Sequence, residues 1–323
     1  MSKDSVALVG VDIGGTNIKI ALVDPATGRL LERSRLKTRA ERGPEAVLGD
    51  LAQSVKELIR HGGARGCQVA GVGVGAAGII DSKEGLVITS PNLPGWVRLP
   101  LTARLGEELR LPVAVGNDVD CLGYGEYWLG AGRELGDFLG IAVGTGVGGC
   151  LIIGGKAWTG VGGSAGEIGH MTIEPDGERC LCGNRGCLET LASASWLVWR
   201  AEKKLQQGTA SLLAKEAGEL DAEDICRAAM KGDPLARELF ARVGRSLAIA
   251  IGNVVHLLDI RAVLIGGGMA RAWDAFIDPL KEELARRVTM APAAAVRVVR
   301  AELGDDAGSL GAAYLAGVNL RLI

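Results

Sequence analysis

Apolar residues in this chain form short continuous runs and longer stretches mixed with polar residues. The short runs predict β-strands, because strands covered on both faces are apolar along their whole length. The predicted strands lie at residues 6–11, 18–23, 69–74, 113–115, 138–143, 150–153, 262–265 and 296–299. The longer stretches predict helices at residues 44–60, 101–109, 191–206, 222–230, 233–258, 273–288 and 307–316. Alternating strands and helices indicate an α/β fold in which helices cover the sheets.

One unit of this pattern occurs twice: an apolar strand, a glycine-rich turn that carries a threonine, and a second apolar strand. The turns lie at residues 12–17 (D-I-G-G-T-N) and 144–149 (G-T-G-V-G-G). Two copies of one supersecondary unit predict two related lobes. We expect residues 1–118 to form an N-terminal lobe, completed by a C-terminal helix at about 305–323. Residues 119–304 then form the C-terminal lobe.

Glycine turns of this kind can bind phosphate, because their backbone N–H groups can converge and no side chain blocks the approach. Taken singly, each turn could equally be an ordinary hairpin turn. We expect Asp12 to hold Mg²⁺ through water and Thr16 to offer a hydroxyl. A third glycine cluster, residues 266–268, could pass under an adenosine. The candidate ATP- and phosphate-binding residues are Asp12, Gly14, Gly15, Thr16, Asn17, Lys19, Gly144, Thr145, Gly146, Gly266, Gly267 and Gly268.

One histidine and three cysteines lie within eighteen residues, separated by glycines: His170, Cys180, Cys182 and Cys187. Three thiolates and one imidazole are a complete tetrahedral ligand set for Zn²⁺. The alternative is a group of buried or redox-active cysteines beside an unrelated histidine. An odd total of seven cysteines argues against a disulfide framework. We predict a structural zinc ion, because all four positions would be protein ligands.

Composition narrows the classes of partner. The net charge of −2 with mixed charges gives no sign of a nucleic-acid surface. No apolar run reaches the roughly 20 residues that a membrane helix needs, and we expect no targeting segment before the first strand. We therefore expect a cytoplasmic protein that acts on small molecules, with no nucleic-acid or membrane partner.

Six motifs occur in the order found in the ROK family (repressors, open reading frames and kinases), which this chain resembles. They are D-I-G-G-T at 12–16, N-L-P-G-W at 92–96, N-D at 117–118, G-T-G-V-G-G at 144–149, E-I-G-H at 167–170 and C-L-C-G-N-R-G-C-L-E at 180–189. The N-L-P-G-W version is similar to that of bacterial glucokinases. The resemblance implies the two-lobed fold of the actin-like ATPases and sugar kinases, with ribonuclease H-like lobes. It also implies zinc on the histidine and the three cysteines.

The same resemblance implies that Asp118 is the general base of an ATP-dependent glucokinase that makes glucose 6-phosphate with Mg²⁺-ATP. A carboxylate at the C-terminal end of the strand predicted at 113–115 could accept the proton of a sugar hydroxyl. The alternative for Asp118 is an N-cap of the following helix.

Further residues are implied to bind sugar hydroxyls together with Asp118: Asn92, Asn117, Glu167, His170 and Glu189. Carboxylates accept hydrogen bonds from hydroxyls, and asparagine can both donate and accept. If one nitrogen of His170 binds zinc, only the other can meet the sugar. Glu167 and Glu189 flank the predicted zinc loop, and the alternative for both is a solvated surface charge.

Other functions within the family stay open. The acceptor could be another hexose, such as fructose, allose or N-acetylmannosamine, and the donor could be polyphosphate. A sugar-responsive regulator of this family carries an N-terminal helix-turn-helix domain, for which we expect the eleven residues before Asp12 to be too few. The family resemblance also implies a homo-oligomer, either a dimer or a tetramer.

Overall fold

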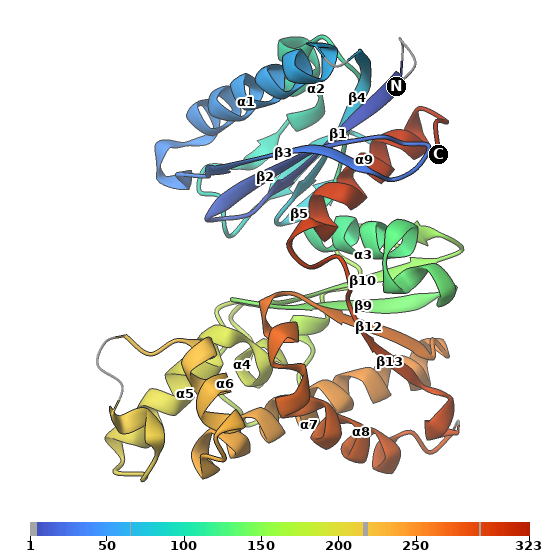
Figure 1. Ribbon diagram of the computed structural model, residues 1–323. Coiled ribbons are helices and arrows are strands. Elements are labelled where there is room, and N and C mark those ends of the chain that lie inside the picture. Colours follow the sequence, from blue (N-terminus) through green and yellow to red (C-terminus); the bar gives the residue numbers. More distant parts are fainter. Residues whose placement is uncertain (1–4, 65, 216–218, 291) are drawn as a thin grey trace. The chain divides into compact units, whose positions relative to one another are not determined.

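The computed structural model describes residues 5–64, 66–215, 219–290 and 292–323, and Figure 1 shows its elements. The chain divides into two compact units. The first unit comprises Met1–Gly136, Cys150–Ala165 and Glu302–Ile323. The second comprises Asp137–Gly149 and Gly166–Ala301.

The first unit contains a five-stranded sheet of order β3-β2-β1-β4-β8. Its strands are β1 (Ser5–Ile13), β2 (Asn17–Val23), β3 (Leu30–Lys37), β4 (Cys67–Ala76) and β8 (Val113–Asn117). Strands β1, β2 and β3 are antiparallel neighbours, whereas β4 runs parallel to both β1 and β8. A smaller antiparallel sheet in this unit consists of β5 (Ile79–Asp81), β6 (Leu86–Thr89) and β7 (Val97–Leu99).

Helices cover both faces of the first sheet. The apolar residues of α1 (Pro44–Ala64) and α2 (Leu101–Leu109) form the larger core with one face of the sheet. The other face packs against α9 (Ala307–Asn319) around Leu8, Ala21 and Leu310. Burying these apolar surfaces is the main stabilising contribution to such a layered arrangement.

Helix α3 (Asp118–Leu129) belongs to the first unit, although the sequence-based lobe boundary at residues 118 and 119 assigns it to the other lobe. The reason is its packing against α9. A Cβ at Gly125 would overlap the backbone oxygen of Ala307, and one at Gly311 would overlap that of Cys121. Only glycine lets two helix backbones come this close, so α3 and α9 form one layer.

The second sheet has the order β11-β10-β9-β12-β13. Its strands are β9 (Phe138–Val143), β10 (Val147–Ile153), β11 (Lys156–Ala157), β12 (Ala262–Gly266) and β13 (Arg297–Arg300). Strand β12 runs parallel to β9 and to β13, and β10 is antiparallel to β11. In the first sheet, β4 and β8 lie on one side of β1 and run parallel to it. In the second sheet, β12 and β13 lie on one side of β9 and run parallel to it. The two five-stranded sheets therefore repeat one strand order, which is typical of two related lobes.

The remaining helices lie in the second unit: α4 (Glu189–Ala192), α5 (Ala194–Gln206), α6 (Ala222–Met230), α7 (Pro234–Leu258) and α8 (Trp273–Arg287). Helix α7 is central, because it contacts α4, α5, α6 and α8. The single helix predicted at 191–206 is interrupted at Ser193, whose side chain caps α5. Short 3-10 turns occur in both units: Ala40–Arg42, Ala131–Glu134, Ile168–His170, Leu212–Lys215, Gly268–Ala272, Ala293–Ala295 and Gly304–Asp306. Among the described residues, no helix combines the length and apolar character needed to cross a bilayer.

Candidate active site and metal centre

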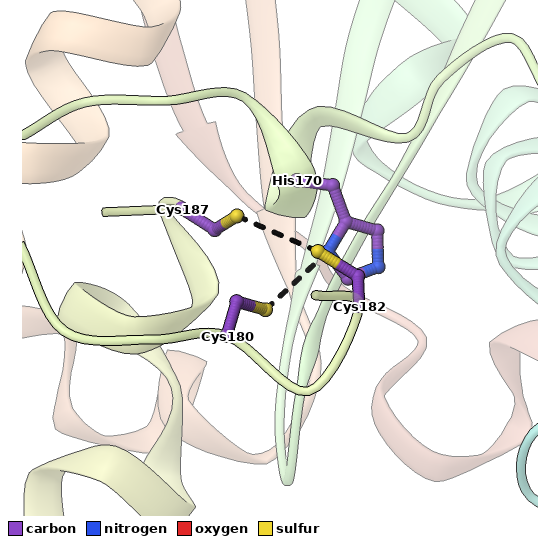
Figure 2. Close-up of side chains that lie close together, drawn as sticks. All are labelled: His170, Cys180, Cys182 and Cys187. Carbon is purple, nitrogen blue, oxygen red and sulfur yellow. Dashed lines mark hydrogen bonds between the residues drawn. The ribbon is translucent and has the colours of Figure 1, made fainter. Parts of the chain in front are cut away.

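The four predicted zinc ligands converge in the second unit (Figure 2). One ligand atom from each of His170, Cys180, Cys182 and Cys187 lies within 4.8 Å of all the others. The two sulfurs of Cys182 and Cys187 are 3.7 Å apart, and Cys180 Sγ is 3.8 Å from His170 Nδ1. Zn–S bonds of about 2.3 Å in a tetrahedral site place two sulfurs about 3.8 Å apart. The donor set and its spacing therefore fit zinc.

Tight backbone turns bring the ligands together. The N–H of Cys180 donates to the Asn184 carbonyl at 2.8 Å, and that of Gly183 donates to Cys180 at 3.0 Å. His170 ends the 3-10 turn Ile168–His170, and Cys187 lies just before α4. These backbone hydrogen bonds hold the loop in the shape that brings the four ligands together.

The three thiols have different proton affinities. Burial raises the pKa of Cys187 to about 12 and also raises the pKa of Cys180. A hydrogen bond from the Asn184 backbone lowers the pKa of Cys182. Because thiolates are the ligands, a metal that binds here displaces protons from the buried thiols.

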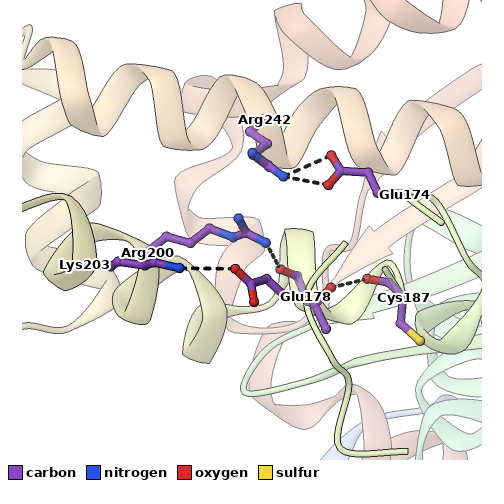
Figure 3. A network of polar contacts seen from close by, with 7 residues as sticks. Glu174, Glu178, Cys187, Arg200, Lys203 and Arg242 are labelled. Carbon is purple, nitrogen blue, oxygen red and sulfur yellow. Dashed lines mark hydrogen bonds and ion pairs between the residues drawn. The ribbon is translucent and has the colours of Figure 1, made fainter. Parts of the chain in front are cut away.

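Three basic side chains tie the zinc loop to its neighbouring helices (Figure 3). Arg242 of α7 donates to both oxygens of Glu174, at 2.8 and 3.0 Å, and Lys203 of α5 lies 3.3 Å from Glu178. Arg200 donates to the Thr190 carbonyl, and the Thr190 hydroxyl donates to the Cys187 carbonyl at 2.8 Å. Sequence reasoning missed these contacts, because the partners are up to 68 residues apart.

The predicted general base lies where β8 meets α3. Asp118 directly follows β8 and is the first residue of α3, as expected for a residue at the carboxyl end of a parallel strand. The alternative prediction that Asp118 caps this helix is wrong. The cap is Asn117, whose Oδ1 accepts from the N–H groups of Val119 at 2.7 Å and Asp120 at 3.1 Å. Asp118 Oδ1 also accepts from the Val119 N–H, at 3.0 Å.

Capping limits what Asn117 can offer a sugar. Besides the two hydrogen bonds accepted by its oxygen, its Nδ2 donates to the Gly78 carbonyl at 2.9 Å. One amide hydrogen of Asn117 is therefore left for a ligand, whereas its oxygen is already in use.

The first glycine turn lies at the carboxyl end of β1, on the same sheet edge as Asn117. Ile13 pairs with Ala76 of β4, and Ala76 pairs with Asn117 of β8. The Gly14 N–H donates to Asn17 at 3.1 Å, which closes the turn. The carboxyl ends of these parallel strands therefore bring the first turn close to the start of α3.

Two other candidates lie beside this turn. A Cβ at Gly15 would stand 3.3 Å from Asn92, so the predicted sugar ligand Asn92 adjoins the turn and is exposed. Asp12 is mostly buried at the end of β1, with Lys19 Nζ 3.9 Å from its Oδ2. Burial raises the pKa of Asp12, and Lys19 partly counteracts this.

The second glycine turn and the third glycine cluster meet in the second unit. Gly266 of β12 pairs with Ala142 of β9, one residue before the strand's end. A Cβ at Gly267 would overlap the Val143 carbonyl oxygen, and Gly267 has a left-handed φ of 81°. The cluster at 266–268 is therefore packed against the start of the turn at 144–149, as expected if both bind one nucleotide.

Helices α4 and α5 hold the second turn. The Ala194 N–H donates to the Gly144 carbonyl at 2.8 Å, and Ser195 Oγ donates to the Thr145 carbonyl at 2.9 Å. The Val147 N–H donates to Glu189 Oε2 at 3.0 Å. Glu189 is half-buried, which excludes a freely solvated charge, whereas Glu167 is exposed. Sequence reasoning missed Ser195, because a serine in the first turn of a helix is common and its partner Thr145 is 50 residues away.

Comparisons with known proteins show the family to which the chain belongs. The chain matches the ROK family over residues 8–318. It is 36% identical to a glucokinase of Thermotoga maritima over 95% of this chain and 96% of that protein. It is 34% identical to an N-acetylmannosamine kinase of Shigella flexneri, over 96% and 98%. A ROK family glucokinase from Streptomyces griseus, solved in complex with glucose and AMPPNP, has 34% identity and a TM-score of 0.81, over 96% and 99%. The chain therefore belongs to the ROK family and has its two-lobed sugar kinase fold.

Proposed function

We propose that this protein is an ATP-dependent glucokinase that converts glucose to glucose 6-phosphate. The observation that carries the proposal is the sheet edge of the first unit, where Asp118 follows β8 and the first phosphate turn follows β1. An acid and a phosphate-binding turn on one edge are what transfer from ATP to an alcohol requires. The 36% identical glucokinase supports this choice of reaction.

In this proposal Asp118 accepts the proton of the sugar's 6-hydroxyl. As the proton leaves, that oxygen bonds to the γ-phosphorus of ATP, and the bond from the γ-phosphorus to the bridging oxygen breaks, which releases ADP. Positioning and charge neutralisation contribute most to such a transfer. Asp12 would hold Mg²⁺ through water, and the metal would neutralise the phosphate charge.

Sugar recognition in the proposal uses exposed groups together with the hydrogen-bonding positions that the protein's own contacts leave open. Asn92 and Glu167 are exposed, and His170 directs Nδ1 at Cys180, which leaves Nε2 for a hydroxyl. Asn117 contributes one amide hydrogen, and Glu189 one carboxylate edge. A site that pairs each hydroxyl rejects analogues that lack one, because its own polar groups then stay unpaired.

The proposed base is tested by the Asp118→Asn and Asp118→Ala variants in a coupled ADP-release assay. We expect kcat to fall by about 10³-fold in both, since general-base catalysis contributes about 10²–10⁴, with glucose affinity changed little. The control is Glu134→Gln, an exposed acid in the 3-10 turn that follows α3, which should keep kcat within about threefold. Turnover by Asp118→Ala near that of the wild type would remove the assignment.

A second candidate is an N-acetylmannosamine kinase, because such a relative is also 34% identical over nearly the whole chain. The same assay with glucose, N-acetylmannosamine, fructose and allose decides between them. We expect glucose to have the highest kcat/KM with ATP. A preference for another hexose would replace the substrate and keep the kinase, whereas sugar binding without turnover would favour a regulator.

A further inference from the structure

Both ends of the zinc loop reach one residue of the second phosphate turn, Val147. We propose that the zinc loop holds this turn in its nucleotide-binding conformation, and that Glu189 is the positioning residue that makes the connection. The zinc site would then act on nucleotide affinity as well as on the loop's own folding. This inference rests on the proposed function, because it takes the turn at 144–149 to bind ATP.

The first connection is steric and comes from the histidine end of the loop. His170 ends a 3-10 turn that begins at Ile168. The residue between them, Gly169, is buried, and a Cβ there would overlap the carbonyl oxygen of Val147. The backbone beside His170 is therefore packed directly against the phosphate turn, with no side chain between them.

The second connection is a hydrogen bond from the cysteine end. Two residues after Cys187, Glu189 Oε2 accepts the Val147 N–H at 3.0 Å, and its Oε1 lies 3.9 Å from Cys180 Sγ. A Cβ at Gly146 would overlap Glu189 Oε2, so the turn and the carboxylate fit closely. A hydrogen bond to an ionised acceptor is about twice as strong as a neutral one.

These contacts select which backbone groups of the turn can meet phosphate. The Gly144 N–H closes the turn by donating to the Gly146 carbonyl at 2.9 Å, and the Val147 N–H is taken by Glu189. Within the part of the chain that the structure describes, the N–H groups of Thr145 and Gly146 find no acceptor. With Val147 fixed, these two neighbouring donors are held ready for phosphate oxygens.

Losing the contacts between the zinc loop and Val147 should weaken nucleotide binding, because binding of the nucleotide would then have to order the turn at 144–149. Fixing the backbone of a residue costs conformational entropy, and a tenfold change in affinity corresponds to about 1.4 kcal/mol. We therefore expect an effect of about tenfold when Glu189 or the metal is removed.

The test measures binding of Mg²⁺-AMPPNP by calorimetry without sugar, beside glucose binding and zinc content. Glu189→Ala should weaken AMPPNP about tenfold and retain zinc. Ser195→Ala removes a contact to the turn but touches no proposed sugar ligand. It should weaken AMPPNP about threefold and leave glucose affinity unchanged. The matched control is Leu181→Ser between two zinc ligands, where the side chain is 93% exposed and should change neither affinity.

Zinc removal by a chelator, with folding checked by circular dichroism, should also weaken AMPPNP about tenfold. Hydrogen exchange of residues 144–149 should rise in the ligand-free protein after zinc removal and in Glu189→Ala. The inference would be overturned if both the zinc-depleted protein and Glu189→Ala kept their AMPPNP affinity, and their hydrogen exchange at residues 144–149, within twofold of wild type. If the wild type binds no AMPPNP, the proposed function fails, and the exchange experiment still decides whether the loop and the turn are coupled.

Discussion

Asp12 is a mostly buried carboxyl group. Its charged form destabilises the fold, although its proposed role in holding Mg²⁺ requires that form. Its side chain is 20% exposed, and a Cβ at Gly308 would lie 2.8 Å from its Oδ2. Burial raises the pKa of Asp12, the Lys19 ammonium 3.9 Å away lowers it, and Asp305 raises it again. Since the folded-state pKa exceeds the unfolded one, the stability contributed by Asp12 is present at acid pH and lost as pH rises through the folded pKa.

We therefore expect Asp12→Asn to raise the thermal midpoint at pH 8, because the amide has the same shape without the buried charge. The gain over wild type should shrink as the pH falls and the wild-type carboxyl becomes protonated. Mg²⁺-ATP turnover should drop by about 100-fold, since the proposed water-mediated Mg²⁺ contact is lost. Thermal melts between pH 4 and 8 check the first part, and a variant less stable than wild type at pH 8 would contradict it.

At the scale of elements, Asp233 fixes the start of the longest helix, α7. Its carboxylate accepts from the N–H groups of Ala236 at 2.9 Å and Leu212 at 2.8 Å, and from the Ser211 hydroxyl at 3.0 Å. Burial raises the pKa of Asp233, but these hydrogen bonds together lower it below its usual value. Asp233 followed by Pro234 is a typical helix start, and it begins the helix predicted at 233–258.

Removing this cap should destabilise the fold in a pH-dependent way. We expect Asp233→Ala to lower the free energy of unfolding by about 2 kcal/mol at pH 7, which is typical of a lost buried cap. A depressed pKa means that the stabilisation is present above the unfolded pKa and lost as pH falls through the folded pKa. The difference from wild type should therefore narrow in acid.

Urea unfolding at neutral and acid pH measures this effect. Asp221→Ala is the matched control, because Asp221 caps α6 at an exposed position and should cost only about 0.5–1 kcal/mol. Equal losses for the two caps, or a difference that does not change with pH, would count against the argument.

Several elements escaped sequence prediction, and helix α3 and strand β3 show the physical reasons. Helix α3 contains Gly123 and Gly125, which lower helix propensity, yet Gly125 is what allows α9 to approach. Strand β3 is not apolar, because it lies at the sheet edge and alternates. Glu32 faces His61 of α1 at 2.9 Å, whereas Arg33 reaches Asp306 at 3.0 Å on the other side. In both cases packing with distant segments decided the structure.

The candidate site also has a part that could be predicted from the sequence and a part that could not. The zinc ligands could be predicted because all four lie in one short loop and their residue types specify the metal. The hydrogen bond between Glu189 and Val147 could not, because it joins positions 42 residues apart. A residue's type indicates which chemistry it can perform, whereas only the fold shows which of its atoms already form hydrogen bonds within the protein.

For the whole molecule, the zinc loop belongs to the second of the two units. The first unit's cores contain residues of β1, β2, α1 and α9. The loop at 171–188 is instead bound to α5 and α7 of the second unit through Lys203 and Arg242. Metal binding stabilises the folded unit that contains the site, so removal of the metal should destabilise the second unit first.

We therefore expect a chelator to lower the stability of the second unit selectively. The calorimetric transition of that unit should shift down by about 5 °C or more, since 1 kcal/mol corresponds to about 2–8 °C for domains of this size. Limited proteolysis should cut first within residues 171–188, while fragments of the first unit persist. Adding Zn²⁺ back should restore both readings. A single transition that shifts as a whole, with cuts spread evenly over both units, would show that the metal stabilises the molecule as one cooperative body.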